Sequence, residues 1–294
     1  MRVRRILISS SLLIFALLAG CQSGPPLKHA LEEKDRTPDG GREVVVFVPQ
    51  GEIRARVVPA TGGFGFGLIG AIVDTSVNQA RAKREETTIA PIRDGLTGYN
   101  FDQKALASVK ETSEKLQWLG VKKVSFSKDV SNESLRKSLD QSQSPQVAFV
   151  AYDYALSADF SSVILTTKVS VMPKTAPPGQ APADRLKMQG AAYAQVFKCP
   201  IALSNPTDMD ANAHRWAVNN SALTRQALDE GLMRIQSMIE RSIAMTPTEV
   251  ANMPHGDATQ VGDYKGRVFD HDGQGTLILD TAGAWIYVEN GPIG

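Results

Sequence analysis

The pattern of hydrophobic and polar residues predicts β-strands through the middle of the chain. In 161–173 the two kinds alternate, so that Val163, Leu165 and Val169 fall on one face, as the two-residue period of a strand requires. Runs of apolar residues predict further strands at 44–48, 53–58, 121–127, 146–156 and about 190–199. Because only residues 49–52 separate the first two runs, we expect these runs to form a hairpin.

A period of three to four residues predicts helices between the strands. The longest spans about 222–244, where an apolar stripe runs from Leu228 to Ile243 and Ser221 is placed to cap the amino end. Shorter helices are expected from about Pro91, over 103–118 and over 131–141.

Three more strand-like runs follow near the end of the chain, at 264–270, 276–280 and 284–289. Turns at Gly273 and Gly283 separate them, which predicts a small C-terminal β-meander, residues 255–294, after a main domain, residues 43–250. The three successive central strands favour antiparallel pairing with helices on one face. We therefore expect an α+β fold, a mixed α/β sandwich with a mostly antiparallel sheet and helices packed on it.

The first twenty residues have the layout of a secretory signal. Three arginines lie within the first five residues, and an apolar run of 13 residues follows from Ile6 to Leu18. A helix of that length measures about 20 Å, which is shorter than the roughly 30 Å hydrocarbon core of a bilayer. We expect residues 1–20 to be a cleaved signal peptide and not a membrane span.

The signal ends in Leu18-Ala19-Gly20-Cys21, which resembles the lipobox of bacterial lipoproteins. The resemblance implies that the thiol of Cys21 receives a diacylglyceryl group, that the chain is cut before this residue, and that lipid holds the protein to a membrane. Gln22 stands where enterobacterial lipoproteins retained in the inner membrane have aspartate, which favours the outer membrane, facing the periplasm. The inner membrane, the cell surface and an ordinary secretory signal with a chance cysteine are the alternatives.

Residues 21–42 are polar and rich in proline and glycine, which predicts a flexible tether with His29 in solvent. Removal of residues 1–20 takes away three arginines and leaves 29 basic and 31 acidic residues, a net charge of −2. This balance provides no electrostatic footprint for nucleic acid, and we expect none as a partner. With Cys21 lipidated, Cys199 is the one remaining thiol, and we expect it to be a buried apolar residue.

A glycine-rich segment, 62–73, carries the pattern G-x-G-x-x-G at Gly65, Gly67 and Gly70. A dinucleotide site would also need an acidic residue at the end of a second strand about 20 positions on, where a polar helix is expected instead. Small residues also recur at every fourth position, which lets a helix pack closely on another backbone. Burial within the fold, membrane contact and contact with a second copy are all open for this segment.

We find no recognisable catalytic or cofactor site in the sequence. Asp270, His271 and Asp272, with Asp257, come nearest to a metal site, but the loop departs from the calcium-binding EF-hand pattern because its twelfth position is Thr281. Hydrolase signatures such as G-x-S-x-G and H-E-x-x-H are absent. We therefore assign no catalytic, cofactor or metal residue and expect a protein that is not an enzyme. Three tryptophans are expected to anchor the core: Trp118, Trp216 and Trp285.

Two further resemblances concern the main domain. The order of elements from about 44 to 244 resembles that of periplasmic lipoproteins with a TolB amino-terminal-like domain, and residues 65–74 and 216–220 resemble segments of uncharacterised proteobacterial lipoproteins. The first resemblance implies a non-enzymatic binding or envelope-assembly role, with an envelope protein or a second copy as the partner. The alternatives are self-assembly through residues 62–73 and a periplasmic enzyme of unknown class.

Overall fold

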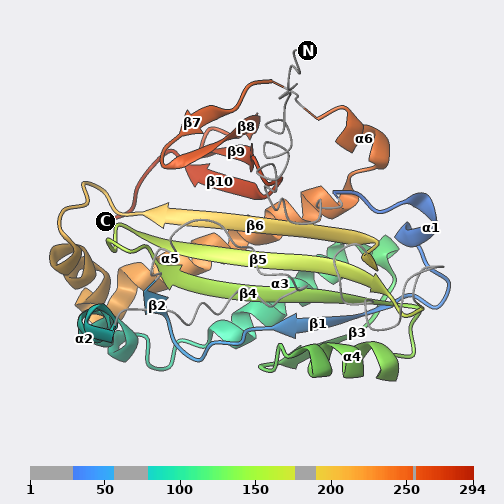
Figure 1. Ribbon diagram of the computed structural model, residues 1–294, viewed down its shortest axis with the longest axis horizontal. Coiled ribbons are helices and arrows are strands. Elements are labelled where there is room, and N and C mark those ends of the chain that lie inside the picture. The colour runs from blue at the N-terminus through green and yellow to red at the C-terminus, as the bar shows by residue number, and fades with distance from the viewer. Residues whose placement is uncertain (1–28, 56–78, 176–189, 254–255) are drawn as a thin grey trace, which may run out of the picture.

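A ten-stranded mixed β-sheet forms the centre of the molecule (Figure 1). The computed structural model describes residues 29–55, 79–175, 190–253 and 256–294, with the backbone alone for 79–85. The strand order is β3-β1-β4-β5-β6-β10-β9-β8-β7, and β2 pairs with β4. The strands are β1 (Arg42–Phe47), β2 (Arg54–Ala55), β3 (Val121–Ser127), β4 (Gln146–Leu156), β5 (Ser162–Pro173), β6 (Tyr193–Ala202), β7 (Thr259–Val261), β8 (Tyr264–His271), β9 (Gly275–Asp280) and β10 (Trp285–Glu289). The helices are α1 (Glu33–Arg36), α2 (Gln79–Gly95), α3 (Phe101–Lys115), the 3-10 helix η1 (Gln117–Leu119), α4 (Asn132–Gln141), α5 (Met209–Ala244) and α6 (Pro247–Ala251).

The central strands β4, β5 and β6 form an antiparallel meander, as their sequence predicts. Every residue of β4 is buried, because this strand has neighbours on both edges and lies in the middle of the sheet. β1 and β3 extend the sheet in parallel on one side, and β10 joins β6 in parallel on the other. The predicted α+β class with a mostly antiparallel sheet is confirmed.

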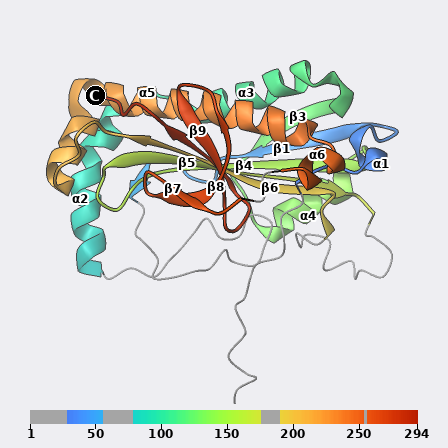
Figure 2. The ribbon, with the colours of Figure 1, turned by 90° about the horizontal axis from the view of Figure 1, so that it is seen from above.

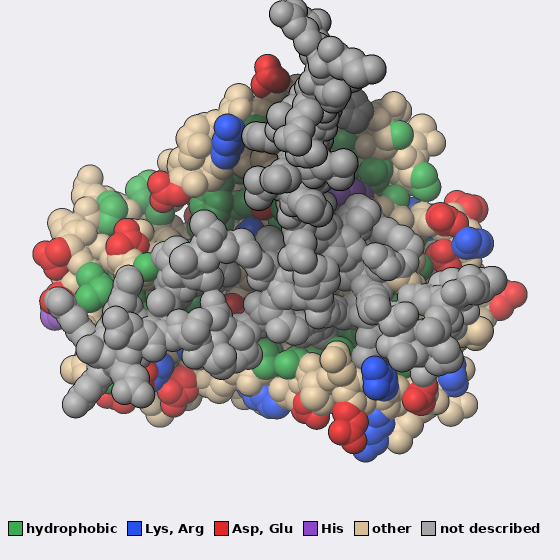
Figure 3. Space-filling view, in the orientation of Figure 1, with side chains coloured by type: hydrophobic (Ala, Val, Ile, Leu, Met, Phe, Trp, Pro, Cys, Tyr) green, Lys and Arg blue, Asp and Glu red, His purple; other side chains and the backbone are tan. Residues whose placement is uncertain are grey.

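Helices cover both faces of the sheet, whereas the sequence predicts them on one face only. α3 and α5 pack on one face (Figure 2), where Trp216 and Phe197 belong to the main core. α4 packs on the opposite face, where Leu135 and Leu139 share a smaller core with Phe149. The face of α4 was not predictable because two buried leucines make a narrow apolar stripe. Figure 3 looks onto the α4 side of the molecule, where acidic and basic side chains gather near this helix.

The predicted hairpin around residue 50 is wrong. β1 and β2 do not pair with each other, and each runs parallel to a different part of β4. The loop between them is tied to the same strand, since the side-chain amide of Gln50 donates to the carbonyl oxygen of Tyr154 at 2.6 Å. Two apolar runs around a short polar loop look the same in sequence whether they pair with each other or follow one another along a third strand.

Helix α5 begins earlier than predicted and contains a left-handed turn. Asp208 caps its amino end by accepting a hydrogen bond from the first turn. The helix is interrupted at Asn219, Asn220 and Ser221, whose φ angles are 53°, 54° and 52°. Ser221 does not cap a helix as expected, because its backbone is left-handed whereas an N-cap residue is extended; its hydroxyl donates to the carbonyl oxygen of Ile92 at 3.0 Å. The predicted helix is thus the second half of α5.

Helix α2 also begins earlier than predicted, because Pro91 lies inside the helix and not at its start. Proline is disfavoured there since it has no amide donor. Its neighbours Ile89 and Ile92 are buried, so tertiary packing of the last turns against α5 outweighs the local preference.

Residues 29–41 lie in the range expected to be a tether, yet they pack against the domain. The side chain of Leu31 is fully buried. The guanidinium of Arg36 donates to the carbonyl oxygens of Ala244 and Met245, at 3.1 and 3.2 Å. These carbonyls belong to the carboxyl end of α5, where a helix leaves acceptors without partners and where positive charge is favourable. The segment is therefore joined to both the core and the longest helix.

Some predictions fall on residues outside the described ranges. These residues are Cys21 with the rest of the lipobox and the glycine-rich segment 62–73.

His29 is half-buried and not in solvent as expected. Its Nδ1 lies 2.5 Å from Nε2 of Gln195, and burial lowers the pKa of its imidazole. Within the described parts of the chain, no helix has the length and apolar character needed to cross a membrane.

The three predicted C-terminal strands are present as β8, β9 and β10, and the short strand β7 precedes them. Gly273 and Gly283 make the turns with φ angles of 80° and 82°, a region that favours glycine. Trp285 and Ile286 pair in parallel with β6, so the meander continues the main sheet and faces the carboxyl half of α5 (Figure 1).

Candidate functional site between helix α5 and the C-terminal strands

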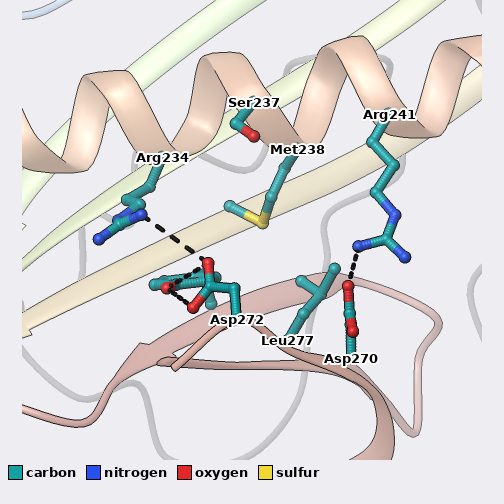
Figure 4. A pocket seen from close by; sticks show the side chains of 8 residues that line it. Arg234, Ser237, Met238, Arg241, Asp270, Asp272 and Leu277 are labelled. Atoms are coloured by element: carbon teal, nitrogen blue, oxygen red, sulfur yellow. Dashed lines mark hydrogen bonds and ion pairs between the residues drawn. The ribbon is translucent and has the colours of Figure 1, made fainter. Parts of the chain in front are cut away.

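A small pocket of about 60 Å³ lies between α5 and the C-terminal meander (Figure 4). Arg234 and Arg241 stand two turns apart on α5, so both side chains point to the same side of the helix. The strands contribute acidic and aromatic groups from the opposite wall. The pocket is lined by Arg234, Ser237, Met238, Arg241, Asp270, Asp272, Leu277 and Tyr287.

Arg234 joins two parts of the meander. Its Nε donates to Oε1 of Glu289 at 3.2 Å, and one terminal nitrogen donates to Oε1 of Gln274 at 2.6 Å. A second terminal nitrogen lies 3.9 Å from a carboxylate oxygen of Asp272, and the guanidinium lies over the ring of Tyr287, 4.7 Å from the centroid. One side chain of α5 therefore holds both β10 and the turn between β8 and β9.

Hydrogen bonding and burial move the pKa values of three groups around Arg234 in different directions. The phenol of Tyr287 donates to both carboxylate oxygens of Asp272, at 2.7 and 2.8 Å. This bond is the largest cause of the lowered pKa of Asp272, while burial raises the pKa of Tyr287. Burial also raises the pKa of Glu289, and the nearby charge of Glu230 adds to that rise.

Arg241, which also lines the pocket, makes a second connection between α5 and the meander. Its guanidinium pairs with the carboxylate of Asp270 and lies over the ring of Phe269, 4.6 Å from the centroid. The ion pair is the largest cause of the lowered pKa of Asp270. Both guanidinium groups thus lie over an aromatic ring while they pair with a carboxylate, a combination that guanidinium groups form more readily than ammonium groups.

The residues considered for a metal site are engaged in these contacts. Asp270 and Asp272 face arginines, and Nδ1 of His271 lies 2.9 Å from the hydroxyl of Thr276. Asp257 is exposed on the segment before β7. Across the described ranges, His, Cys, Asp and Glu residues do not gather in groups able to hold a metal ion. The pocket joins α5 to the meander by charge pairing, and its carboxylates serve as acceptors for arginine and tyrosine.

Sequence reasoning did not single out Arg234, Arg241 or Glu289. The available signal was the seven-residue spacing of the two arginines on a predicted helix, but their partners lie 29 to 55 residues away along the chain. Among the predicted core residues, Trp216, Trp285 and Cys199 are fully buried, as expected. Trp118 is half-buried instead, with the guanidinium of Arg36 over its ring at 4.4 Å from the centroid.

A broader groove lies on the outer side of α3 and α5. It has a volume of about 650 Å³ and contains Met233, whose side chain is 55% exposed. Ion pairs join the helices at its two ends, Lys104 with Asp229 at 2.8 Å and Lys115 with Glu240 at 3.3 Å. Two ion pairs thus bridge the helices across the groove, and an exposed apolar side chain lies between them.

Comparison with known proteins gives little further information. The sequence matches no protein-family model and no curated protein. Among solved structures, a variant PelC dodecamer from Paraburkholderia phytofirmans is 10% identical, with a TM-score of 0.21 over 70% of this chain and 92% of that chain. A second PelC dodecamer from the same organism is 10% identical, with a TM-score of 0.19 over 73% of this chain and 93% of that chain. Likeness at this level carries no argument about fold, partner or assembly.

Proposed function

We propose that the protein is a lipid-anchored envelope lipoprotein with a non-enzymatic binding or assembly role, held in the periplasm at the outer membrane. The lipobox sequence ending in Cys21 supports the anchor. The observation that carries the binding role is the open groove between α3 and α5, with the exposed Met233 in it. Methionine is flexible and polarisable, and proteins use it on surfaces that bind other proteins.

The way the chain enters the domain supports a position close to the membrane. Leu31 is buried and Arg36 binds the end of α5, so nine residues, 22–30, separate Cys21 from the first buried side chain in this proposal. Nine residues reach about 32 Å at full extension. The domain would therefore meet a partner that lies within a few tens of ångströms of the anchoring membrane.

The charged pocket between α5 and the meander is consistent with a structural and not a catalytic use of its groups. Arg234 and Arg241 face the three carboxylates of Asp270, Asp272 and Glu289. A catalytic acid or base must be within reach of a substrate proton, whereas these carboxylates already accept hydrogen bonds from arginine or tyrosine.

The anchor is tested with Cys21→Ala in the full chain. We expect labelled palmitate to enter the parent and not the variant, and the variant to move from the membrane fraction to the periplasmic fraction. Label in the variant at the level of the parent would contradict the anchor. Centrifugation of inner and outer membranes on a sucrose gradient tests the outer-membrane position in the same experiment.

The binding role is tested by photocrosslinking in cells. Benzoylphenylalanine in place of Met233 should give a discrete crosslinked product with another envelope protein on irradiation. The same substitution at Lys137, an exposed residue of α4 on the other face, is the matched control and should give none. Identical patterns from the two positions, or no product from either, would overturn binding at this groove.

A further inference from the structure

The sheet face that carries α4 contains a group of charged and hydroxyl side chains beyond the end of that helix. In the rows nearest α4 the face is apolar, with Val147, Phe149 and Met172 in the smaller core. Farther along, the pairing of β4, β5 and β6 places Asp153, Thr166 and Lys198 in one row across the sheet. Burying polar groups within a sheet is costly unless they are hydrogen-bonded or paired with an opposite charge.

Two ion pairs fix the borders of this group. A terminal nitrogen of Arg54 lies 2.7 Å from Oδ1 of Asp153. Nζ of Lys198 lies 3.5 Å from Oδ2 of Asp280, whose other oxygen accepts from the backbone amides of Ala282 and Ala284 at 2.9 and 2.8 Å. Both carboxylates of the group therefore already have cationic partners.

Lys168 is the remaining cation. It lies on β5, two residues after Thr166 and on the same face, in the next row of the sheet. It is half-buried, and no hydrogen bond or ion pair joins its ammonium to any part of the chain that the structure describes. Burial is the largest influence on the pKa of Lys168 and lowers it, the charge of Asp153 raises this pKa, and the charge of Lys198 lowers it further.

The charges of the group do not cancel within the described residues. Arg54, Lys168 and Lys198 carry three positive charges, and Asp153 and Asp280 carry two negative charges. Lys168 carries the charge that no carboxylate of the described residues pairs with, and a single negative charge from a ligand would balance it. An ammonium held partly away from water without a counterion is unfavourable, so the ligand would gain affinity from a group that the fold already holds in place.

The hydroxyl of Thr166, beside Lys168, also has no partner in the described parts of the chain. Oγ1 of Thr166 is buried and accepts or donates no hydrogen bond in the described residues, and the whole residue is 7% exposed. Ser170, two residues after Lys168 on the same face, is 5% exposed. Buried hydroxyl groups are nearly always hydrogen-bonded in native proteins. Thr166, Lys168 and Ser170 thus place hydrogen-bond donors at every second residue along one face of β5.

We propose that Lys168 and Thr166, with Lys198 beside them, bind an oxyanion of single charge, a carboxylate or phosphodiester group. An ammonium binds such groups as a point charge, and the threonine hydroxyl donates a hydrogen bond for which the described residues offer no acceptor. The site is on the opposite sheet face from the α3–α5 groove and does not depend on the lipid anchor.

Calorimetric titration of the purified protein tests the proposal with two probes. Acetate represents a carboxylate, and dihexanoyl phosphatidylglycerol below its micelle concentration represents a phosphodiester of a lipid headgroup. We expect the parent to bind at least one probe, and the probe that binds identifies the source of the oxyanion. Lys168→Met should weaken that binding at least tenfold, and Thr166→Val, which keeps the side-chain shape, should weaken it about tenfold.

Lys137→Met on the exposed face of α4 is the matched control, because it removes the same charge at a distance from the site. It should leave the affinity within about twofold of the parent. Circular dichroism and a thermal melt establish that each variant is folded, and if Lys168→Met is not, Thr166→Val and Lys168→Gln supply the comparison. Failure of the parent to bind either probe, or equal affinity of parent and folded site variants, would overturn the proposal.

Discussion

Burial is the largest influence on the most unusual side chains of this protein. It lowers the pKa of Arg42 to about 10, and this guanidinium is held by the carbonyl oxygens of Asp35 and Arg36 at 2.7 and 2.9 Å. Burial also lowers the pKa of Lys168 and raises that of the Cys199 thiol. In each case, transfer from water penalises the charged form, and the direction of the shift follows from the sign of that charge.

Cys199 should be unreactive in the folded protein. Its side chain is fully buried and its pKa is well above the usual value, so little thiolate forms near neutral pH and reagents cannot reach it. In the Cys21→Ala variant, where Cys199 is the single thiol, we expect no labelling by iodoacetamide over hours in buffer and complete labelling in denaturant. Rapid labelling of the folded protein would contradict this burial.

Lys168→Met should stabilise the protein near neutral pH when no oxyanion is present. Replacing a partly buried charge by an apolar side chain of similar length is expected to raise the free energy of unfolding by about 1 kcal/mol. The pKa of Lys168 is lower in the folded protein than in the unfolded chain. At pH values between these two pKa values, the unfolded chain binds more protons than the folded protein does. The free energy of unfolding of the parent therefore rises with pH across this window. The groups facing this ammonium are Asp153 and Lys198.

The free energies of unfolding of the parent and of Lys168→Met should therefore become more alike as the pH rises through that window. Urea unfolding at several pH values between neutral and about 10.5 measures them. A constant difference would mean that the charge of Lys168 does not contribute. Lys137→Met, with an exposed side chain, should show no such trend.

Among the secondary-structure elements, α5 has the most unusual geometry. Three successive residues in the left-handed region divide it, and side chains of its second half tie the turn down: Oγ1 of Thr224 donates to the carbonyl oxygen of Trp216, and Arg225 donates to that of Asn220. The end of α2 also packs closely here, since a Cβ on Gly95 would lie 2.3 Å from Oγ of Ser221. Tertiary contacts therefore maintain a backbone that is unfavourable for residues with side chains.

Asn220→Ala should lower the free energy of unfolding by about 1 kcal/mol, because a left-handed conformation is costlier for alanine than for asparagine. Asn220→Gly should leave it unchanged or higher, since glycine adopts this conformation readily. Both substitutions remove the same exposed amide side chain, so their difference isolates the backbone effect. Equal stability of the two variants in urea unfolding would argue against the left-handed turn.

Considered as a whole, the molecule is organised around α5. Its amino half contacts the end of α2, its carboxyl half contacts the C-terminal meander through two arginines, and its last carbonyls bind Arg36 of the N-terminal segment. The three parts that surround the central sheet thus share one helix. A change at one of these contacts is expected to affect the stability of the whole domain, because the meander is continuous with the sheet through β10 and β6.

Arg234→Met should lower the free energy of unfolding by about 3 kcal/mol, because it leaves the carboxylate of Glu289 without its cationic partner. The side chain of Glu289 is 8% exposed and that of Arg234 is 16% exposed. Adding Glu289→Gln should restore at least 1 kcal/mol of the loss. Urea unfolding of the parent, both single variants and the double variant measures the coupling.

Arg136→Met provides the matched control for that cycle, since Arg136 is exposed on α4. It should change the free energy of unfolding by no more than about 0.5 kcal/mol. Losses that simply add in the double variant would show that Arg234 and Glu289 act independently.

Much of the fold was accessible from the sequence. The strands β3 and β4 and the helix α4 match their predicted ranges within a residue, and Trp216, Trp285 and Cys199 lie in the core as expected. These features depend on local periodicity and on the apolar character of single side chains, both of which can be read from a short stretch of sequence. The lipid on Cys21 and the partner of the protein remain predictions, because they depend on other molecules.

The fold corrected the sequence reasoning wherever a contact joins distant parts of the chain. β1 and β2 line up along β4 instead of pairing, Pro91 lies within a helix, and residues 29–41 pack on the domain. The charged pocket and the group around Lys168 arise in the same way, from α5 meeting the meander and from three strands set side by side. Local sequence specifies which segments are helix or strand through side-chain periodicity and backbone preference. Which segments meet, and which charges then share a buried space, depends on long-range packing that no local pattern encodes.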